Sequence, residues 1–559
     1  MHLRLKVSLL TLCLVLWASS WIRGQHASMT VKGNLPTGSQ ALVWFKPNEG
    51  IMVQGRAIPK GFLKPGVTIE TWIDYRDLNS DGKRWALLVL FPKDEWKENQ
   101  VIHQVAYPEL ETVWLISTFF TGHGQNYDEL MSINPLLPEK VRKGDQWIIP
   151  RQLLAKELGG LKIRPNKSSP EDSLDDEAKI EAYRRLLTYQ LKADEKYAIY
   201  HLRKGEAIYS DVVLRYTDRV FPLEVNALSL LIAKKSGIRD VRIIKPGQAL
   251  LIPIDYLASP FQPEGSVALK DEKEVRDKIK QTESLSASPN LKGVAIILDA
   301  GHGGIDPGAS ANGLWESDFV YDIANRVRSQ LLKETQATVR NVISYPGVRN
   351  TIRNRIKKIS PSAEILTSPP YRNDGENPSS VGVHLRWIVS NSWTSKFISA
   401  QGDPKKTLFI SFHADSLHPS ASGTMVYVPG SSGVPDRFQI RGLKGVQVNE
   451  LPKYGSVTFT PQERFLGEVR SRQFAESLIK KLAQNQLPIH KNRAIRNIIQ
   501  REGTAFVPAV IRYNKSSTKI LIEVANLNNP VDAENLSDPE FRSRFAESVC
   551  EAIKGYFKN

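Results

Sequence analysis

Two histidines and two glutamates stand where this chain could assemble a hydrolytic site. His302 lies in the glycine-rich stretch LDAGHGGIDPGASANGLWES, and Glu316 follows it 14 residues later. His413 comes a further 97 residues on, at the end of the apolar run TLFISFH, and Glu523 lies within KILIEVANL. Two imidazoles and one carboxylate would give zinc three protein ligands and leave a fourth position open for water, which is the composition of a catalytic site.

The predicted elements can bring these residues to one edge of a sheet. VAIILDA, residues 294–300, is an apolar run typical of a strand covered on both faces. The glycines that follow allow a tight loop around His302. After Glu316, apolar residues recur every four positions and predict a helix with one apolar face. They are Phe319, Ile323, Val327 and Leu331. His413 ends a second strand and so can share the rim with His302.

Each of these residues also has an ordinary structural explanation. A histidine such as His302 is common in surface loops, and a first-turn glutamate such as Glu316 is favoured by the helix dipole. Glu523 could lie on the exposed face of an edge strand. If it is buried, it needs a partner or a proton. Beside a metal it becomes a candidate for proton transfer, because metal-assisted hydrolysis needs a carboxylate near the bound water.

The stretches that carry His302, Glu316, His413 and Glu523 resemble, in this order, the zinc-dependent N-acetylmuramoyl-L-alanine amidases. The catalytic domain of that family opens with a DxGHGGxDxGA element and a downstream glutamate. Here that element is DAGHGGIDPGA, residues 299–309, and FISFHADS, SGTMVYVPG and LIEVANLNNP are similar to later parts of the family. The resemblance runs from about Val294 to the C-terminus. It implies that His302, Glu316 and His413 bind Zn²⁺ and that Glu523 is the catalytic carboxylate.

The resemblance also implies an activity and a fold. The activity is hydrolysis of the amide between N-acetylmuramic acid and L-alanine in peptidoglycan, with a zinc-bound water as nucleophile and Glu523 as proton acceptor and donor. The fold class is α/β, with a mostly parallel sheet flanked by helices. Two alternatives stay open: a weak or inactive peptidoglycan-binding protein, and a zinc amidohydrolase or deacetylase acting on another cell-wall substrate.

Two upstream stretches end alike and predict a repeated module. VRKGDQWIIP (residues 141–150) and IIKPGQALLIP (243–253) each run from a glycine turn into an apolar strand. With the residues before them, they predict a strand, two helices and a strand in residues 101–155 and 197–256. Both regions resemble the lysin motif (LysM), a βααβ module that binds N-acetylglucosamine-containing glycans, with Asn134 and LRKGEAIY as further matching features. The alternative is a packing unit without a ligand.

The remaining segments predict the other domain boundaries. Residues 1–24 join a basic start to a short apolar run and predict a signal peptide, with an uncleaved membrane anchor as the alternative. Residues 30–100, including RWALLVLFP, predict short strands of unknown role. Residues 259–292 predict a linker with one exposed helix. Residues 293–559 are then a tethered zinc amidase domain.

The net charge limits the classes of binding partner, and the cysteine content limits the disulfides that the chain can form. The chain carries 75 Lys+Arg against 59 Asp+Glu, a net charge of +16, which favours a polyanionic or carboxylate-bearing partner. Nucleic acid fits poorly, because no zinc-finger spacing, RNP motif or basic recognition helix is present. We expect an exported periplasmic or extracellular protein that acts on peptidoglycan without a stable membrane anchor. With Cys13 removed in the signal peptide, Cys550 could form no intramolecular disulfide.

One long segment departs from the family pattern. Residues 335–406 are longer than the family usually has between the first helix and the second histidine, and Ser368 replaces an arginine there. The segment includes the basic run RNTIRNRIKK, which predicts a solvated helix or a cover over the site. Autoinhibition by this segment and dependence on a protein activator therefore stay open.

Overall fold

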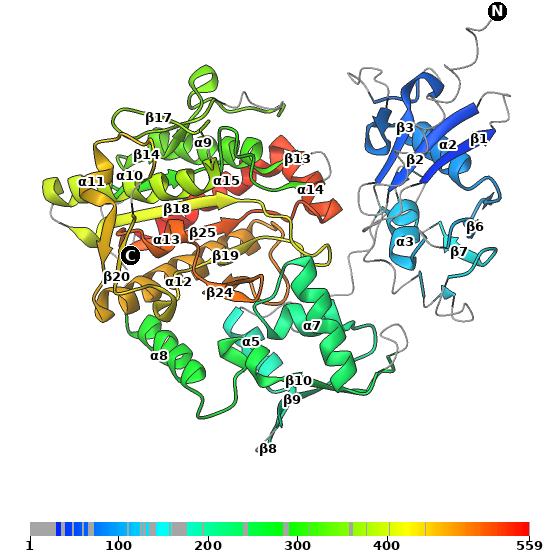
Figure 1. Cartoon of the computed structure of the whole chain (residues 1–559), viewed down its shortest axis with the longest axis horizontal. Helices are drawn as coiled ribbons and strands as arrows, with labels where there is room; N and C mark the ends of the chain where they lie inside the picture. The colour runs from blue at the N-terminus through cyan, green and yellow to red at the C-terminus, as the bar shows by residue number, and fades with distance from the viewer. Residues whose placement is uncertain are drawn as a thin grey trace, which may run out of the picture. The chain divides into compact units, whose positions relative to one another are not determined.

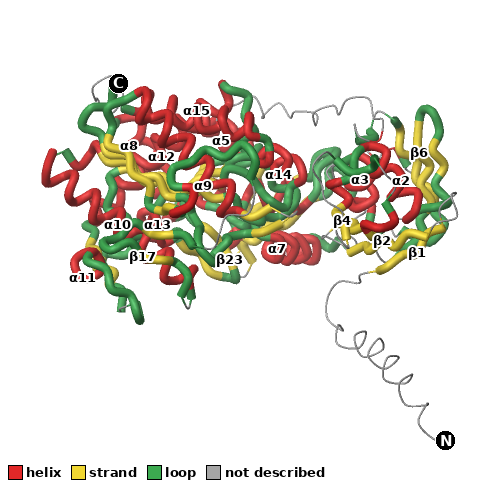
Figure 2. Tube along the Cα trace, turned by 90° about the horizontal axis from the view of Figure 1, so that it is seen from above, coloured by secondary structure: helices red, strands yellow, loops and turns green. Residues whose placement is uncertain are grey.

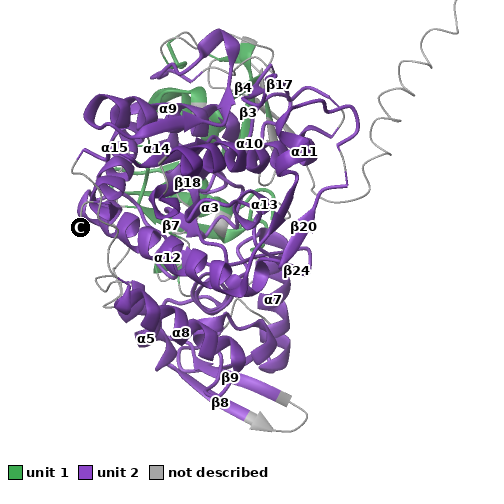
Figure 3. Ribbon diagram, turned by 90° about the vertical axis from the view of Figure 1, so that its left-hand side faces the viewer, with its two compact units in different colours: residues 1–166 green, residues 167–559 purple. Residues whose placement is uncertain are grey.

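The computed structural model describes residues 29–557 apart from short internal segments. Those segments are 35–39, 47–49, 59–60, 65–71, 109–110, 123–125, 127–129, 132, 135–140, 152, 156–157, 159–175, 193–194, 239–243, 283–289, 312–313, 357–361, 376, 402 and 442. The predicted signal peptide and Cys13 lie outside the described residues. Among the helices that are described, none has the length and apolar character needed to cross a membrane. The chain divides into two compact units, residues 1–166 and 167–559 (Figure 3).

The first unit begins with the predicted β-rich region. Four antiparallel strands lie in the order β1 (Met29–Asn34), β2 (Gln40–Lys46), β3 (Gly50–Gln54) and β4 (Trp72–Asp74). The prediction of a strand at RWALLVLFP is wrong, because most of it lies in helix α2 (Ser80–Leu90). Asn79 caps this helix by accepting from Gly82 N, and the buried Ala86, Leu87 and Leu90 recur at helical spacing.

The first LysM-like region also lies in this unit. Strands β5 (Glu95–Trp96), β6 (Gln100–Gln104) and β7 (Gln146–Pro150) form one sheet, with helix α3 (Val113–Thr121) between β6 and β7. The Asn134 side chain exchanges two hydrogen bonds with the backbone of Ile148, at 2.8 and 2.9 Å. Asn134 therefore ties the segment after α3 to strand β7. The predicted second helix lies mostly outside the described residues.

The second LysM-like region shows the predicted order of elements. Strand β9 (Glu195–His201) pairs antiparallel with β10 (Ala249–Pro253), and the helical segments η6 (Ile208–Val213), α6 (Leu214–Tyr216) and α7 (Pro222–Lys235) lie between them in the chain. An additional strand, β8 (Leu187–Lys192), pairs with the other edge of β9. Glycan binding by either region stays a prediction.

This second module is packed against the C-terminal part of the unit, although the sequence predicts a tethered domain. Arg496, only 1% exposed, donates to the backbone oxygens of Thr217 and Leu214 at 2.9 and 3.1 Å. Arg493 forms a buried ion pair with Asp218. The sequence gives no warning of these contacts, because each one joins residues more than 270 positions apart.

The predicted linker contains the expected helix, but one face of that helix is covered. Helix α8 (Val267–Gln281) packs on α12 (Pro461–Gln484). Glu272 is 5% exposed and receives two hydrogen bonds from Arg472, at 2.5 and 3.1 Å. Arg276 donates a third at 2.8 Å. The helix looks solvated in sequence because only Leu269 and Val275 give its buried face an apolar signal, while Glu272 on the same face is charged.

This cluster predicts an acid-sensitive contact. Burial would raise the pKa of Glu272, but Arg472 and Arg276 outweigh burial and lower it to about 2 from an ordinary 4.5. Ionised Glu272 therefore stabilises the folded chain fully above about pH 4.5, and this stabilisation disappears as the pH falls towards 2. Between these two limits its contribution to the free energy of unfolding changes by about 3 kcal/mol. Urea unfolding should show Glu272→Gln well below wild type in stability at pH 6 and nearer to it at pH 3. Glu274→Gln, an exposed change on the same helix, should track wild type at both pH values.

The C-terminal part of the second unit is built on the expected mostly parallel sheet (Figure 1). Its strand order is β14-β11-β18-β25-β19-β22, and only the β19–β25 pair is antiparallel. The strands are β11 (Ala295–Asp299), β14 (Thr338–Asn341), β18 (Thr407–His413), β19 (Met425–Tyr427), β22 (Ile495–Arg496) and β25 (Thr518–Glu523). Every residue of β11 and β25 is buried, as their apolar sequences predict.

Helices cover both faces of this sheet, which confirms the predicted α/β class. Helix α9 begins at Glu316, as predicted, and contacts α15, which in turn contacts α12. Helices α10 and α13 contact each other and pack on the strands from the other side. For α10 this side is expected, because the crossovers from β11 to β14 and from β14 to β18 run in opposite directions along the sheet and such crossovers are right-handed. Their bounds are α9 (Glu316–Glu334), α10 (Pro378–Gln401), α13 (Ala509–Arg512) and α15 (Pro539–Tyr556). Figure 2 shows strands between helical layers in this part of the chain.

The basic run in the long segment after α9 is not the solvated helix that its sequence predicts. Its described part, residues 349–356, is irregular. Asp322 on α9 accepts from Arg353 N at 2.6 Å, and Arg542 on α15 donates to the backbone oxygens of Arg353 and Asn354. The run is therefore held by buried charged side chains on two helices, which a helical periodicity cannot reveal.

Candidate metal centre

The three predicted zinc ligands lie together at the carboxyl end of the parallel strands. His302 follows β11 in the glycine-rich loop, His413 is the last residue of β18, and Glu316 is the first residue of α9. One ligand atom from each residue lies within 4.8 Å of the others. The fold therefore brings together three residues that span more than 100 positions of the chain.

Glu316 lies between the two histidines and is 2% exposed. Its Oε2 is 3.7 Å from His302 Nε2, and its Oε1 is 3.0 Å from His413 Nδ1. The backbone N–H groups of Ala309 and Ala414 donate to the two oxygens at 2.7 and 3.0 Å. Burial would raise the pKa of Glu316, but the histidines and the backbone donors outweigh it and lower the pKa to about 2. Glu316 is thus an anion, as a metal ligand must be.

Two glycines of the loop are required by close approach. A Cβ on Gly308 would lie 2.4 Å from Glu316 Oε2 and 2.7 Å from a carbon of the His302 ring. A Cβ on Gly301 would lie 2.4 Å from the backbone oxygen of Phe412. Both glycines also have positive φ angles, +69° and +66°. The two glycines are therefore needed because a larger residue would clash with the candidate ligands or with the strand that carries His413.

Hydrogen bonds at the far side of each imidazole select the nitrogen that faces Glu316. His302 Nδ1 lies 3.0 Å from Asp306 Oδ2, so the carboxylate accepts its proton and leaves Nε2 as the ligand atom. His413 Nε2 lies 3.1 Å from Ser411 Oγ. Since Ser411 donates to Asp299 Oδ2 at 2.7 Å, its oxygen accepts from His413 and leaves Nδ1 as the ligand atom.

The donor set and its outer partners fit zinc. Two imidazole nitrogens and a carboxylate oxygen are the ligands of a three-residue catalytic zinc site. Each ring is oriented by an acceptor on its other nitrogen, as is usual for metal-bound histidine. Asp306, Ser411 and Asp299 all lie in the quoted motifs, but their residue types and spacing alone predict no role for them. Arg386, which donates to Asp299 at 2.6 Å, comes from α10 and had no sequence signal.

Glu523 is buried beside this cluster. It ends β25, lies in register with His413 across the β18–β25 pair, and is 4% exposed. The edge-strand alternative is wrong because β25 lies between β18 and β19. Asp415 N donates to Glu523 Oε2 at 2.8 Å. Burial raises the pKa of Glu523 well above its usual range, and the carboxylates of Asp415 and Glu316 raise it further. Such a carboxyl is suited to hold a proton.

The Ser411 hydroxyl provides a direct test of ring positioning. We expect Ser411→Ala to weaken zinc affinity by roughly 10- to 100-fold, because His413 loses the acceptor that fixes its tautomer and orientation. Chelator competition measures this affinity. Ser390→Ala is the matched control, since Ser390 is equally buried in α10 and bonds Asn514 instead. Equal zinc affinities for the two variants would contradict a positioning role for Ser411.

Comparison with known proteins places this site in a defined family domain. Residues 296–555 match the model of the Amidase_3 family, described as N-acetylmuramoyl-L-alanine amidase. The match covers slightly less than half of the chain and includes His302, Glu316, His413 and Glu523. Residues 296–555 are therefore similar to the domain that defines this family.

Curated relatives share this part of the chain. An uncharacterized cell wall amidase of Bacillus anthracis is 25% identical over 270 residues, which cover 48% of this chain and 36% of the relative. N-acetylmuramoyl-L-alanine amidase AmiC of Escherichia coli O6:H1 is 24% identical over 275 residues, covering 47% of this chain and 53% of AmiC. The chain thus spans about half or less of the length of these two relatives.

Solved amidase structures also align with this region. The amidase Ami1 from Mycobacterium smegmatis is 18% identical and aligns over 48% of this chain and 98% of its own, with a TM-score of 0.29. The catalytic domain of CwlV from Bacillus (Paenibacillus) polymyxa var. colistinus is 19% identical and aligns over 47% of this chain and 97% of its own, with a TM-score of 0.27.

Proposed function

We propose that this chain is a zinc-dependent peptidoglycan hydrolase that cleaves the amide between N-acetylmuramic acid and the L-alanine of the stem peptide. The observation that carries the proposal is the convergence of His302, Glu316 and His413 beside the buried Glu523, inside an amidase-family domain. Zn²⁺ held by the three ligands would lower the pKa of a water molecule and polarise the scissile carbonyl.

In this proposal each residue has a separate task. His302 Nε2, His413 Nδ1 and a Glu316 oxygen hold the ion, while Asp306 and Ser411 fix the two rings. Because the Asp415 amide already binds Glu523 Oε2, Oε1 is the oxygen that takes the proton of the attacking water. Glu523 then delivers that proton to the departing alanine nitrogen. Its raised pKa favours holding the proton between these two steps.

Mass spectrometry of digested sacculi tests the activity. The expected products are free stem peptides and glycan strands that have lost them. New reducing ends at muramic acid would indicate a glycosidase, released acetate a deacetylase, and unchanged sacculi an inactive binding protein. Any of these three results would reject the proposed reaction.

The proposed place of action is the periplasm or the extracellular wall, where peptidoglycan lies. The secretion signal predicted for residues 1–24 and the net charge of +16 support this proposal. Whether a protein activator is also a partner stays open.

We propose that the two LysM-like regions hold the enzyme on glycan strands, because two weak sites on one chain raise the effective affinity. A chain beginning at Lys167 keeps the second unit intact. It should still hydrolyse a soluble muramyl peptide but sediment less with sacculi than the full chain, compared at ~0.15 M salt, where exposed charges are screened. Equal sedimentation of the shortened and the full chain would contradict a glycan-binding role for the first LysM-like region. A start at Gly293 is unsuitable because Arg493 and Arg496 would lose their buried partners.

A further inference from the structure

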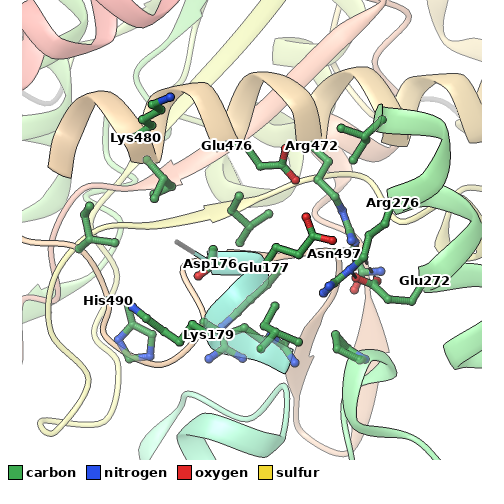
Figure 4. A pocket seen from close by; sticks show the side chains of 18 of the residues that line it. Asp176, Glu177, Lys179, Glu272, Arg276, Arg472, Glu476, Lys480, His490 and Asn497 are labelled. Carbon is green, nitrogen blue, oxygen red and sulfur yellow. Dashed lines mark hydrogen bonds and ion pairs between the residues drawn. The ribbon is translucent and has the colours of Figure 1, made fainter. Parts of the chain in front are cut away.

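A cavity in the second unit shares no lining residue with the three candidate metal ligands. It has a volume of about 690 Å³ and lies between α5 (Asp176–Arg184), α8, α12 and the segment around β22 (Figure 4). A volume of this size is typical of sites for small organic molecules. The proposed amidase reaction gives this cavity no task.

The cavity wall carries an excess of positive charge. Eight cationic side chains line it, against four carboxylates. The cations are Lys179, Arg276, Lys280, Arg472, Lys480, Lys491, Arg493 and Arg496, and the carboxylates are Asp176, Glu177, Glu272 and Glu476. Three further carboxylates, Asp211, Asp218 and Glu468, pair with Lys491, Arg493 and Arg472. Positive charge remains in excess after all these pairings.

Some of the cationic groups have hydrogen-bonding capacity that the described residues do not use. Lys179 is only 8% exposed, and the described part of the chain offers it no hydrogen bond or ion pair. Three guanidinium nitrogens of cavity-lining residues also lack a partner among the described residues: Arg472 Nε, Arg493 Nη1 and Arg496 Nε. Buried polar groups in proteins are almost always hydrogen-bonded, and a buried unpaired ammonium is costly.

Like charges are also crowded at one end of the cavity. Burial, together with the neighbouring Arg493, lowers the pKa of Arg496 to about 10. His490, which burial and Arg496 hold at a pKa of about 3, is a neutral ring that adds no charge of its own. An anion bound here would relieve this repulsion.

The wall is apolar between these charged groups. The apolar lining residues are Ile180, Ile279, Ile479, Ala483, Ile489 and Ile495. A bare inorganic ion would leave this surface unused. We propose that the cavity is a binding site for a small organic oxyanion, with carboxylate or phosphate groups held by Lys179, Arg472 and Arg493 and an apolar body against the isoleucines. Such a ligand would join α5 and α8 to the amidase-family domain through α12.

Calorimetric titration of the full chain tests for this ligand. The probes are citrate, pyrophosphate, sulfate and the uncharged triethyl citrate, all at ~0.15 M salt so that exposed charges are screened. We expect one molecule of citrate or pyrophosphate per chain, with a matching rise in Tm. Stronger citrate binding assigns a carboxylate ligand, and stronger pyrophosphate binding a phosphate ligand. If neither citrate nor pyrophosphate binds, or if neither binds more tightly than sulfate, the cavity takes an adventitious anion only. Either result overturns the proposal.

Substitutions locate the binding to this cavity. Lys179→Met should weaken binding of the tighter probe at least about tenfold, because it removes a buried charge-assisted contact. Its ligand-free Tm should equal or exceed that of wild type, since an unpaired ammonium is lost. Lys480→Met, at the cavity on α12, should also weaken binding and is safe for folding because Lys480 is exposed.

Lys270→Met is the matched control, since Lys270 is exposed on α8 and does not line the cavity. If Lys179→Met or, should it not fold, Lys480→Met binds the probe as tightly as Lys270→Met, the proposal is wrong. Hydrolysis of a muramyl peptide should be unchanged in all three variants. The titration therefore decides the anion site whatever the outcome for the amidase activity.

Discussion

A His302→Ala variant is expected to lose both its zinc and its turnover. Two protein ligands would remain, Glu316 and His413, and a catalytic zinc site normally has three. The free carboxylate of Asp306 would also lose its hydrogen-bond partner at 3.0 Å. Because removing even an outer partner of a ligand costs roughly 10- to 100-fold, the loss of turnover should exceed about 10²-fold. Elemental analysis and hydrolysis of a muramyl peptide measure the two effects.

The matched control is His384→Ala, which removes a half-buried histidine of α10 that lies outside the metal-ligating group. It should retain one zinc ion per chain and near-normal turnover. If His302→Ala retains full zinc content after dialysis against a weak chelator, His302 is not a ligand and the metal centre has been placed wrongly.

Glu523→Gln should have the opposite signature, with metal retained and turnover lost. Glutamine keeps the shape of the side chain and its bond from Asp415 N, but it cannot accept a proton. We therefore expect the wild-type zinc content and a fall in turnover of roughly 10²-fold or more, the usual scale for losing acid–base help.

Glu450→Gln controls for the loss of a buried carboxylate. Glu450 is 3% exposed and accepts from Ser368 N, away from the metal-ligating residues. Its replacement should leave both zinc content and turnover close to wild type. A zinc-free Glu523→Gln would make Glu523 a ligand, and a fully active one would place the proton acceptor at another residue.

The meeting of the three candidate metal ligands was largely predictable because its signals are local in the sequence. Buried parallel strands are continuous apolar runs, so the ends of β11 and β18 could be located, and with them His302 and His413. The glycines around His302 mark a loop that must approach other groups closely. The role of Arg386 could not be predicted, because its contact with Asp299 joins residues 87 positions apart.

The packing of the preceding segments was not predictable for a related reason. Charged residues in α8 and near β22 look solvated in a sequence, yet Glu272 and Arg496 are buried against partners about 200 or more positions away. Apolar periodicity does not report contacts of this kind. The error at α2 arose differently, since a short apolar run fits a strand or a helix until the Asn79 cap is known.

Digestion of sacculi in ¹⁸O-labelled water tests the central claim most directly. Hydrolysis of the amide puts the oxygen of water on the acyl carbon, so the label should appear in the lactyl carboxylate of muramic acid. The stem peptide should be released with a free amino group on its L-alanine. The Glu523→Gln variant should release both much more slowly. Label at the reducing carbon of the glycan, in released acetate or in a new carboxylate within the stem peptide would contradict the proposed reaction.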